Sequence, residues 1–153
     1  MKRLAGWIAV AFVPAVIGAP FPAPDYYARL EKPRWAPPAW LFGPAWTLLY
    51  TLIGVAAWLV AKRCEPGARP ALRLWGVQLA LNAAWTPIFF GLRAPGIAFG
   101  EVIATWVAIA ATTIAFFGRR TAAGALMLPY LAWVTFAAAL NFEIWRRNPG
   151  RRA

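Results

Sequence analysis

The sequence contains no histidine and a single cysteine, Cys64. One cysteine cannot form an intramolecular disulfide, and without histidine no Cys/His set can hold zinc. Acidic residues are also scarce, with five Asp and Glu among 153 residues. The chain shows no pattern of an acid–base pair, an activated nucleophile or a metal cluster. We therefore expect no required cofactor, no metal site and no hydrolytic active site.

Charge is confined to short segments of the chain. Lys and Arg number 16, the formal net charge is +11, apolar residues make up 61%, and the mean hydropathy is +0.55. A soluble domain of this length could not bury so much apolar surface. The basic residues fall between apolar runs and at the ends, where they would meet lipid headgroups. No basic face accompanies a nucleic-acid-binding motif. We therefore expect a lipid bilayer as a partner and no nucleic acid.

Long uncharged runs indicate membrane-spanning helices. A helix needs about 20 apolar residues to cross roughly 30 Å of hydrocarbon, and in lipid the backbone must satisfy its own hydrogen bonds. The strands of a membrane barrel would alternate in polarity, and these runs do not. The sequence predicts one domain, an all-α membrane protein with five transmembrane helices near residues 4–21, 40–61, 72–92, 96–117 and 122–145.

The first predicted span has an alternative interpretation. Its basic start and apolar run are also typical of a signal peptide, which would be cleaved near residues 18–20. We favour a retained helix because four further spans follow. With five spans, the 16 basic residues divide eight to eight between the two sides of the membrane. The positive-inside rule therefore assigns no topology.

The stretch 32–50, KPRWAPPAWLFGPAWTLLY, combines three tryptophans with four prolines. Each proline removes a backbone donor and favours extended geometry in the residue before it. The first half is therefore expected to be a stiff, extended segment, and the second half to begin a long apolar helix. We interpret this junction as the lid and wall of a ligand cavity.

The third predicted helix has two different faces. At about 100° per residue, Gln78, Asn82, Trp85 and Phe89 lie within about 60° of one another. Amides in mid-membrane must find a hydrogen-bonding partner, either on another helix or on a ligand. The opposite face carries small residues at four-residue spacing, which allow a close approach between helices. That face predicts either a homodimer interface or packing within the chain; its residues are Gly76, Ala80 and Ala84.

Two other predicted helices carry aromatic stripes. The second presents Trp46, Tyr50 and Ala57, and the fifth presents Tyr130, Trp133, Ala137 and Asn141. Each stripe taken alone is more typical of plain packing. Three helices that each offer aromatic rings and an amide or hydroxyl together predict a pocket for a large, flat, mostly apolar ligand.

Two acidic residues lie within predicted helices. Glu143 precedes Arg146 and Arg147 by three and four residues, so a local ion pair at the helix end is expected. Glu101 lies near the start of the fourth helix, and the sequence does not decide whether it faces inward or reaches the interface.

The motifs resemble those of the translocator protein family, whose bacterial members are called tryptophan-rich sensory proteins and whose animal members were once called the peripheral benzodiazepine receptor. The resemblance covers nearly the whole chain. It is carried by DYY at 25–27, LEKPRWAPP at 30–38, WTLLY at 46–50, QLALN at 78–82 with WTP at 85–87, PYLAW at 129–133 and LNFE at 140–143. The KPxWxPP motif before a helix containing WTxLY is its most specific part.

The resemblance implies five helices, a long loop between the first two helices over an internal cavity, and dimerisation through the third helix. It also implies a multi-pass protein, here expected in a bacterial cell-envelope membrane, that binds porphyrins such as protoporphyrin IX or haem. Sensing, regulation or transport of porphyrin would be its function. Together with the helix faces, it predicts a ligand-binding site made of Tyr27, Trp46, Tyr50, Asn82, Trp85, Phe89, Tyr130, Trp133, Ala137 and Asn141.

Three further expectations follow from the resemblance. Without histidine, a metal-free porphyrin fits the chain better than haem. Phe142 stands where animal members carry the tyrosine of a sterol-recognition pattern, so we expect no strong sterol binding. As an alternative function, some bacterial members are reported to degrade protoporphyrin in light and oxygen, and Trp46 and Trp133 match the tryptophans proposed to take part.

Overall fold

The computed structural model describes residues 2–22, 24–63 and 65–150, so Cys64 lies outside the described residues. This part of the chain is helical and contains no strand. The elements in chain order are α1 (Lys2–Ala11), α2 (Val13–Gly18), α3 (Pro24–Arg29), the 3-10 turn η1 (Ala39–Leu41), α4 (Phe42–Ala61), α5 (Ala68–Thr86), the π-helical turn η2 (Pro87–Gly91), α6 (Pro95–Phe117) and α7 (Thr121–Arg147).

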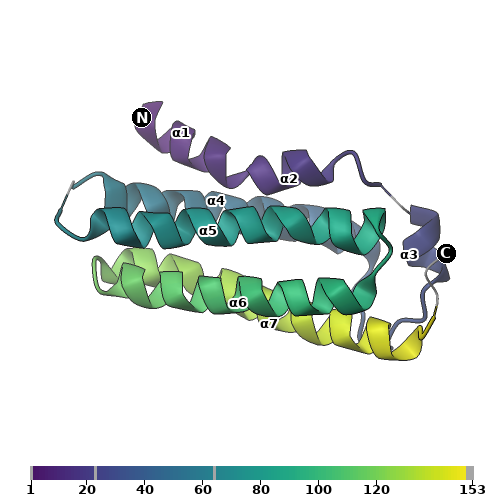
Figure 1. Cartoon of the computed structure of the whole chain (residues 1–153). Helices are drawn as coiled ribbons and strands as arrows, with labels where there is room; N and C mark the ends of the chain where they lie inside the picture. The colour runs from purple at the N-terminus through teal and green to yellow at the C-terminus, as the bar shows by residue number, and fades with distance from the viewer. Residues whose placement is uncertain (1, 23, 64, 151–153) are drawn as a thin grey trace.

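The long helices lie side by side (Figure 1), and the contacts between them close into a ring. Helix α7 contacts α4 and α6, α6 contacts α5, α5 contacts α2, and α1 returns to α4. The short helix α3 lies across one end of this bundle, near the end of the described chain. The ring therefore encloses a shared interior that is open towards α3.

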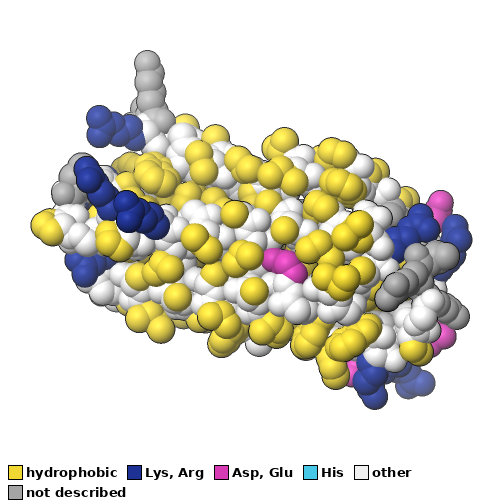
Figure 2. All heavy atoms as spheres, viewed as in Figure 1, with side chains coloured by type: hydrophobic (Ala, Val, Ile, Leu, Met, Phe, Trp, Pro, Cys, Tyr) yellow, Lys and Arg dark blue, Asp and Glu magenta, His cyan; other side chains and the backbone are white. Residues whose placement is uncertain are grey.

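Within the described part of the chain, three helical segments are long and apolar enough to cross a membrane, namely Ala39–Ala61, Pro95–Phe117 and Thr121–Arg147. The segment Arg3–Gly18 is apolar but shorter. The outer surface agrees with burial in lipid, because apolar side chains cover the flank in Figure 2 and basic side chains gather at its two ends. This distribution suits a hydrocarbon layer bounded by headgroups.

The first helical segment differs from the expected single helix over 4–21. It is interrupted after Ala11, and its second part ends at Gly18. Pro14 is the cause, because its ring nitrogen has no hydrogen to donate to the preceding turn and its ring crowds that turn. Around the break, the N–H of Ala15 donates to Phe12 at 3.0 Å.

Helix α5 begins earlier than the expected residue 72. Gly67, with a φ of 87°, adopts the left-handed conformation just before its first residue, which glycine does without steric cost. At its other end Pro87 again removes a donor, and the chain continues as the π-helical turn η2. The Leu92 N–H closes this turn on the Pro87 carbonyl at 2.9 Å.

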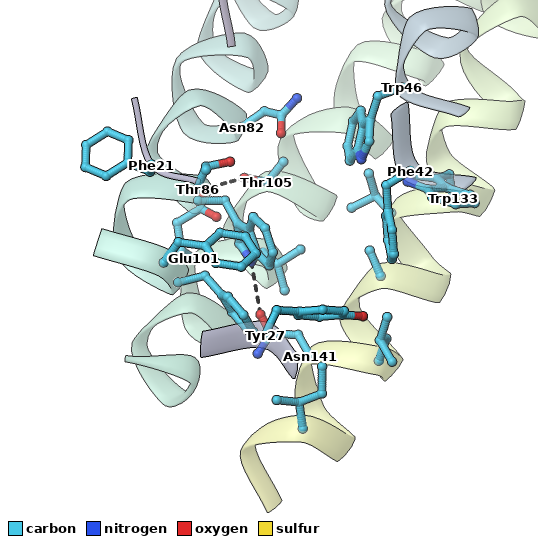
Figure 3. Close-up of a pocket in the computed structure, with 18 of the residues that line it drawn as sticks. Phe21, Tyr27, Phe42, Trp46, Asn82, Thr86, Glu101, Thr105, Trp133 and Asn141 are labelled. Atoms are coloured by element: carbon cyan, nitrogen blue, oxygen red, sulfur yellow. Dashed lines mark hydrogen bonds between the residues drawn. The ribbon is translucent and has the colours of Figure 1, made fainter. Parts of the chain in front are cut away.

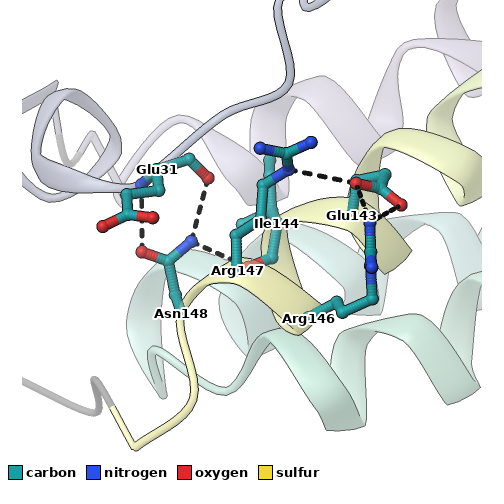
Figure 4. A network of polar contacts seen from close by, with 6 residues as sticks. All are labelled: Glu31, Glu143, Ile144, Arg146, Arg147 and Asn148. Carbon is teal, nitrogen blue, oxygen red and sulfur yellow. Dashed lines mark hydrogen bonds and ion pairs between the residues drawn. The ribbon is translucent and has the colours of Figure 1, made fainter.

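The connection between α2 and α4 is held against the end of α7. It contains α3, a short helix that the sequence did not predict. The Glu31 N–H donates to Asn148 Oδ1 and Asn148 Nδ2 donates to the Glu31 carbonyl, both at 2.9 Å. Asn148 Nδ2 also donates to the Ile144 carbonyl at 2.8 Å (Figure 4). We call this arrangement the Asn148 latch.

Candidate functional site

A cavity of about 440 Å³ lies at the α3 end of the ring. Helices α4, α5, α6 and α7 and the turn η2 form its walls, and Phe21, Pro22, Pro24 and Tyr27 of the α2–α4 connection border it. Its volume falls in the range of small-molecule sites, and most of its lining is apolar. The connection therefore borders the cavity at this end, and we refer to it as the lid.

Aromatic rings from α4 and α7 make one wall. Phe42, Trp46 and Trp133 lie together on one side of the cavity in Figure 3. The Trp46 and Trp133 ring centroids are 6.4 Å apart at an interplanar angle of 86°, and those of Phe42 and Trp133 are 5.9 Å apart. Such edge-to-face contacts hold the rings rigidly. This wall offers a flat ligand a preformed stacking surface.

The opposite wall combines rings with polar groups. Trp85 and Phe89 are stacked, with ring centroids 4.7 Å apart. The Trp85 indole N–H donates to Asn141 Oδ1 at 3.0 Å, and Asn141 Nδ2 donates to the Pro95 carbonyl at 2.8 Å. Asn82 Nδ2 donates to the Tyr50 hydroxyl at 3.2 Å. The amides therefore tie helices together at the edge of the cavity.

Three polar atoms of lining residues lack hydrogen-bond partners. They are Tyr27 Oη, Glu101 Oε2 and Trp133 Nε1, all enclosed by protein. An enclosed polar atom without a partner costs about 1–3 kcal/mol. Three such atoms belong to the lining of one cavity, where water or a bound molecule can satisfy them.

Tyr27 lies in the lid and is contacted by the side chain of Lys32. Lys32 Nζ donates to the Tyr27 carbonyl at 2.8 Å and lies 4.7 Å from the centroid of its ring. The Tyr27 ring contacts Phe42 and Phe90, which line the cavity. Burial raises the pKa of the Tyr27 phenol, so this hydroxyl remains a neutral donor at ordinary pH.

Most of the predicted site residues lie around this cavity. Eight of the ten predicted residues line it, namely Tyr27, Trp46, Asn82, Trp85, Phe89, Trp133, Ala137 and Asn141. The other two, Tyr50 and Tyr130, are not among the lining residues. Tyr50 lies behind Trp46 with ring centroids 5.2 Å apart. Tyr130 is fully buried and donates to Gln78 Oε1 at 2.8 Å, so Gln78 serves an interhelical contact.

Several lining residues were not predicted. They include Phe21, Phe42, Thr86, Phe90, Glu101 and Thr105. Phe42 lies one turn before Trp46, and Thr105 lies one turn after Glu101, so helical spacing could have indicated both. Phe90 enters the wall because of the π-helical turn, which apolar periodicity does not indicate. Glu101 is half-buried and is among the lining residues, so part of its side chain faces inward.

Other predicted features lie outside the cavity. The ion pair of Glu143 is confirmed, with Arg146 at 2.9 Å and Arg147 at 3.0 Å. Trp40 is 71% exposed, next to the start of α4. On α5, Gly76 and Ala80 are exposed, and a Cβ added at Gly76 would meet nothing within 4 Å. This face of α5 is therefore open.

Comparisons with known proteins match most of the chain. A family model for the TspO/MBR family matches residues 5–146. The chain is 43% identical over 145 residues to the tryptophan-rich sensory protein of Cereibacter sphaeroides, covering 95% of this chain and 90% of that protein. It is 40% identical to Protein CrtK of Rhodobacter capsulatus over 137 residues, covering 88% of this chain and 86% of that protein.

A mammalian relative extends the likeness beyond bacteria. The chain is 44% identical over 130 residues to the human translocator protein, covering 83% of this chain and 77% of that protein. The family match over residues 5–146 spans nearly all of the helices and the cavity walls described above. With a family match over most of its length and apolar helices of spanning length, the protein is membrane-embedded and belongs to the TspO/MBR family.

Proposed function

We propose that the protein binds a flat tetrapyrrole of the protoporphyrin type in the cavity and acts as a membrane sensor, regulator or transporter of that ligand. The observation that carries the proposal is a cavity walled by indole and phenyl rings and bordered by a lid with its own aromatic residue, Tyr27. Rings of this kind favour stacking on a flat ligand. The relatives named sensory protein and translocator protein support a role in sensing or translocation.

In this proposal five helical units cross the membrane. They are α1 with α2, α4, α5 with η2, α6 and α7, while the α2–α4 connection stays at one interface. The closed ring supports the proposal, because each unit packs lengthwise against its neighbours. The two arginines early in α5, Arg69 and Arg73, would lie near the headgroups, where long basic side chains reach water.

We also propose that two copies associate through the open face of α5. Gly76 and Ala80 are exposed there and Ala84 is half-buried, so the backbone of a partner helix could approach closely. Replacing Gly76 with leucine is expected to reduce the dimer fraction measured by cross-linking in bilayer nanodiscs. Gly100→Leu is the matched control, because Gly100 is also exposed with open space at its Cβ. Equal dimer fractions in both variants would contradict this interface.

The binding proposal is tested by titrating protoporphyrin IX into the purified protein in nanodiscs. Saturable binding is expected from the change in porphyrin absorption and from quenching of tryptophan fluorescence. Trp46→Ala should weaken binding about tenfold or more, since an aromatic stacking contact is worth about 1–3 kcal/mol. Trp40→Ala should change it less than twofold, because Trp40 is exposed and does not line the cavity. Absence of saturable binding, or equal losses in the two variants, would refute the proposal.

The same experiment can also measure haem binding and the bleaching of porphyrin under illumination. Without histidine, haem is expected to bind without the axial spectrum of a histidine ligand. Photodegradation by Trp46 and Trp133 has no support beyond the presence of both indoles in one wall, so we do not propose it. Bleaching no faster than that of free porphyrin is the expected result under illumination.

A further inference from the structure

Among the residues that the structure describes, Glu101 is the single carboxylate that lines the cavity, and no Lys or Arg lines it. It lies on α6, opposite the wall formed by Trp46 and Trp133 (Figure 3). The indole rings on that opposite wall carry no formal charge. Among the described lining residues, the one side chain that can carry a formal charge at ordinary pH is therefore that of Glu101, and this charge is negative.

The surroundings of this carboxylate leave one oxygen available. Thr105 Oγ1 donates to Glu101 Oε1 at 2.6 Å, whereas Oε2 has no partner. The Trp85 indole N–H is already used, because it donates to Asn141, and one of the two hydrogens of Asn82 Nδ2 is donated to Tyr50. Oε2 is enclosed in the wall, but rotation about the last side-chain bond is broad for Glu and can turn it towards the cavity.

A carboxylate within the apolar part of a membrane protein is costly unless it is paired. A cationic N–H group would form a charge-assisted hydrogen bond, which is about twice as strong as a neutral one. The aromatic rings add attraction, because their faces are electronegative and favour a nearby cation. The carboxylate and the aromatic rings therefore both favour a cationic group on the ligand.

We propose that Glu101 makes the cavity selective for ligands that present a protonated amine or another cationic N–H group to the α6 wall. The inference rests on the proposed ligand-binding role of the cavity and names the polar group that it recognises. The flat part of the ligand lies between the aromatic walls. Any carboxylates of the ligand point away from Glu101 and towards the lid, where Lys32 lies against Tyr27.

The test compares two probes of one shape that differ in charge. A biaryl methylamine, protonated at pH 7, and the corresponding biaryl methanol are titrated into the whole protein in nanodiscs and followed by tryptophan fluorescence. The amine is expected to bind at least tenfold more tightly than the alcohol. In Glu101→Gln the amine should lose this advantage, while the affinity for the alcohol should change less than threefold. Glu143→Gln is the matched control, and it should preserve the tenfold preference because Glu143 pairs with arginines away from the cavity.

The possible outcomes distinguish the role of Glu101 from the proposal that the cavity binds a tetrapyrrole. Equal affinities of the two probes for the unmodified protein would overturn the inference, and so would a preference that survives Glu101→Gln. A Glu101→Gln protein that does not fold leaves the comparison in the unmodified protein as the deciding measurement. Protoporphyrin IX is titrated in parallel. If protoporphyrin failed to bind while amine selectivity held, the tetrapyrrole proposal would fail and the role of Glu101 would stand.

Discussion

Removal of the Asn148 latch is predicted to loosen the lid without unfolding the bundle. Asn148→Ala deletes three hydrogen bonds, two to the Glu31 backbone and one to the Ile144 carbonyl. Asn148 is only 5% exposed, so water replaces these bonds poorly. Two of these bonds join α7 to the lid, so at about 0.5–1.5 kcal/mol for each bond the free energy of opening the lid should fall by about 1–3 kcal/mol.

Hydrogen exchange measures this opening directly. A loss of about 1–3 kcal/mol corresponds to roughly 5- to 140-fold faster amide exchange, because each 1.4 kcal/mol is a factor of ten. Peptides that cover residues 26–36 should show the increase, and peptides from the middle of α6 should not. Mass spectrometry of the protein in nanodiscs provides both readings in one experiment.

The matched control changes another polar residue at the same end of α7. Glu143→Gln breaks ion pairs with Arg146 and Arg147, whose side chains are exposed. Exposed pairs contribute little, so exchange in 26–36 should change less than threefold. If Asn148→Ala also changed it less than threefold, the latch would not be what holds the lid.

Two further predictions concern the bundle. A Cβ at Gly54 would lie 2.7 Å from the α1 backbone. Gly54→Ala should therefore destabilise the fold by about 1–3 kcal/mol and lower Tm by several degrees. Gly100→Ala is the control and should not lower Tm, because the space at its Cβ is open. Asn141→Leu should cost about 2–3 kcal/mol by leaving the Trp85 indole N–H without its acceptor. Adding Trp85→Phe should recover part of that loss in thermal unfolding; no recovery would mean that this hydrogen bond is not the cause.

Much of the site could be predicted from spacing along helices. Uncharged runs indicated the long helices, since lipid excludes charge, and stripes of aromatic and amide residues indicated the faces that turn inward. Trp46, Asn82, Trp85 and Trp133 lie where those stripes place them. These features depend on local periodicity, which a single sequence carries.

The features of the site and lid that the sequence did not predict depend on backbone geometry and on contacts between distant segments. Tyr50 shares a stripe with Trp46, yet it lies one turn deeper, where the neighbouring helices fill the space in front of it. Phe90 reaches the cavity through a π-helical turn, and a 3.6-residue period does not describe that turn. The partner of Glu31 is 117 residues away, and nothing local indicates it.

The closed ring has a consequence for the order of assembly. Helix α7 is synthesised after the other described helices, and it supplies the wall that contains Trp133, Ala137 and Asn141. An intermediate that lacks α7 therefore has an open groove on the side where the indole wall will form. A ligand that fills the cavity stabilises only the completed chain, because it has no equivalent site before α7 is inserted. Ligand supplied during synthesis should therefore raise the yield of the complete protein and leave the abundance of shorter nascent chains unchanged.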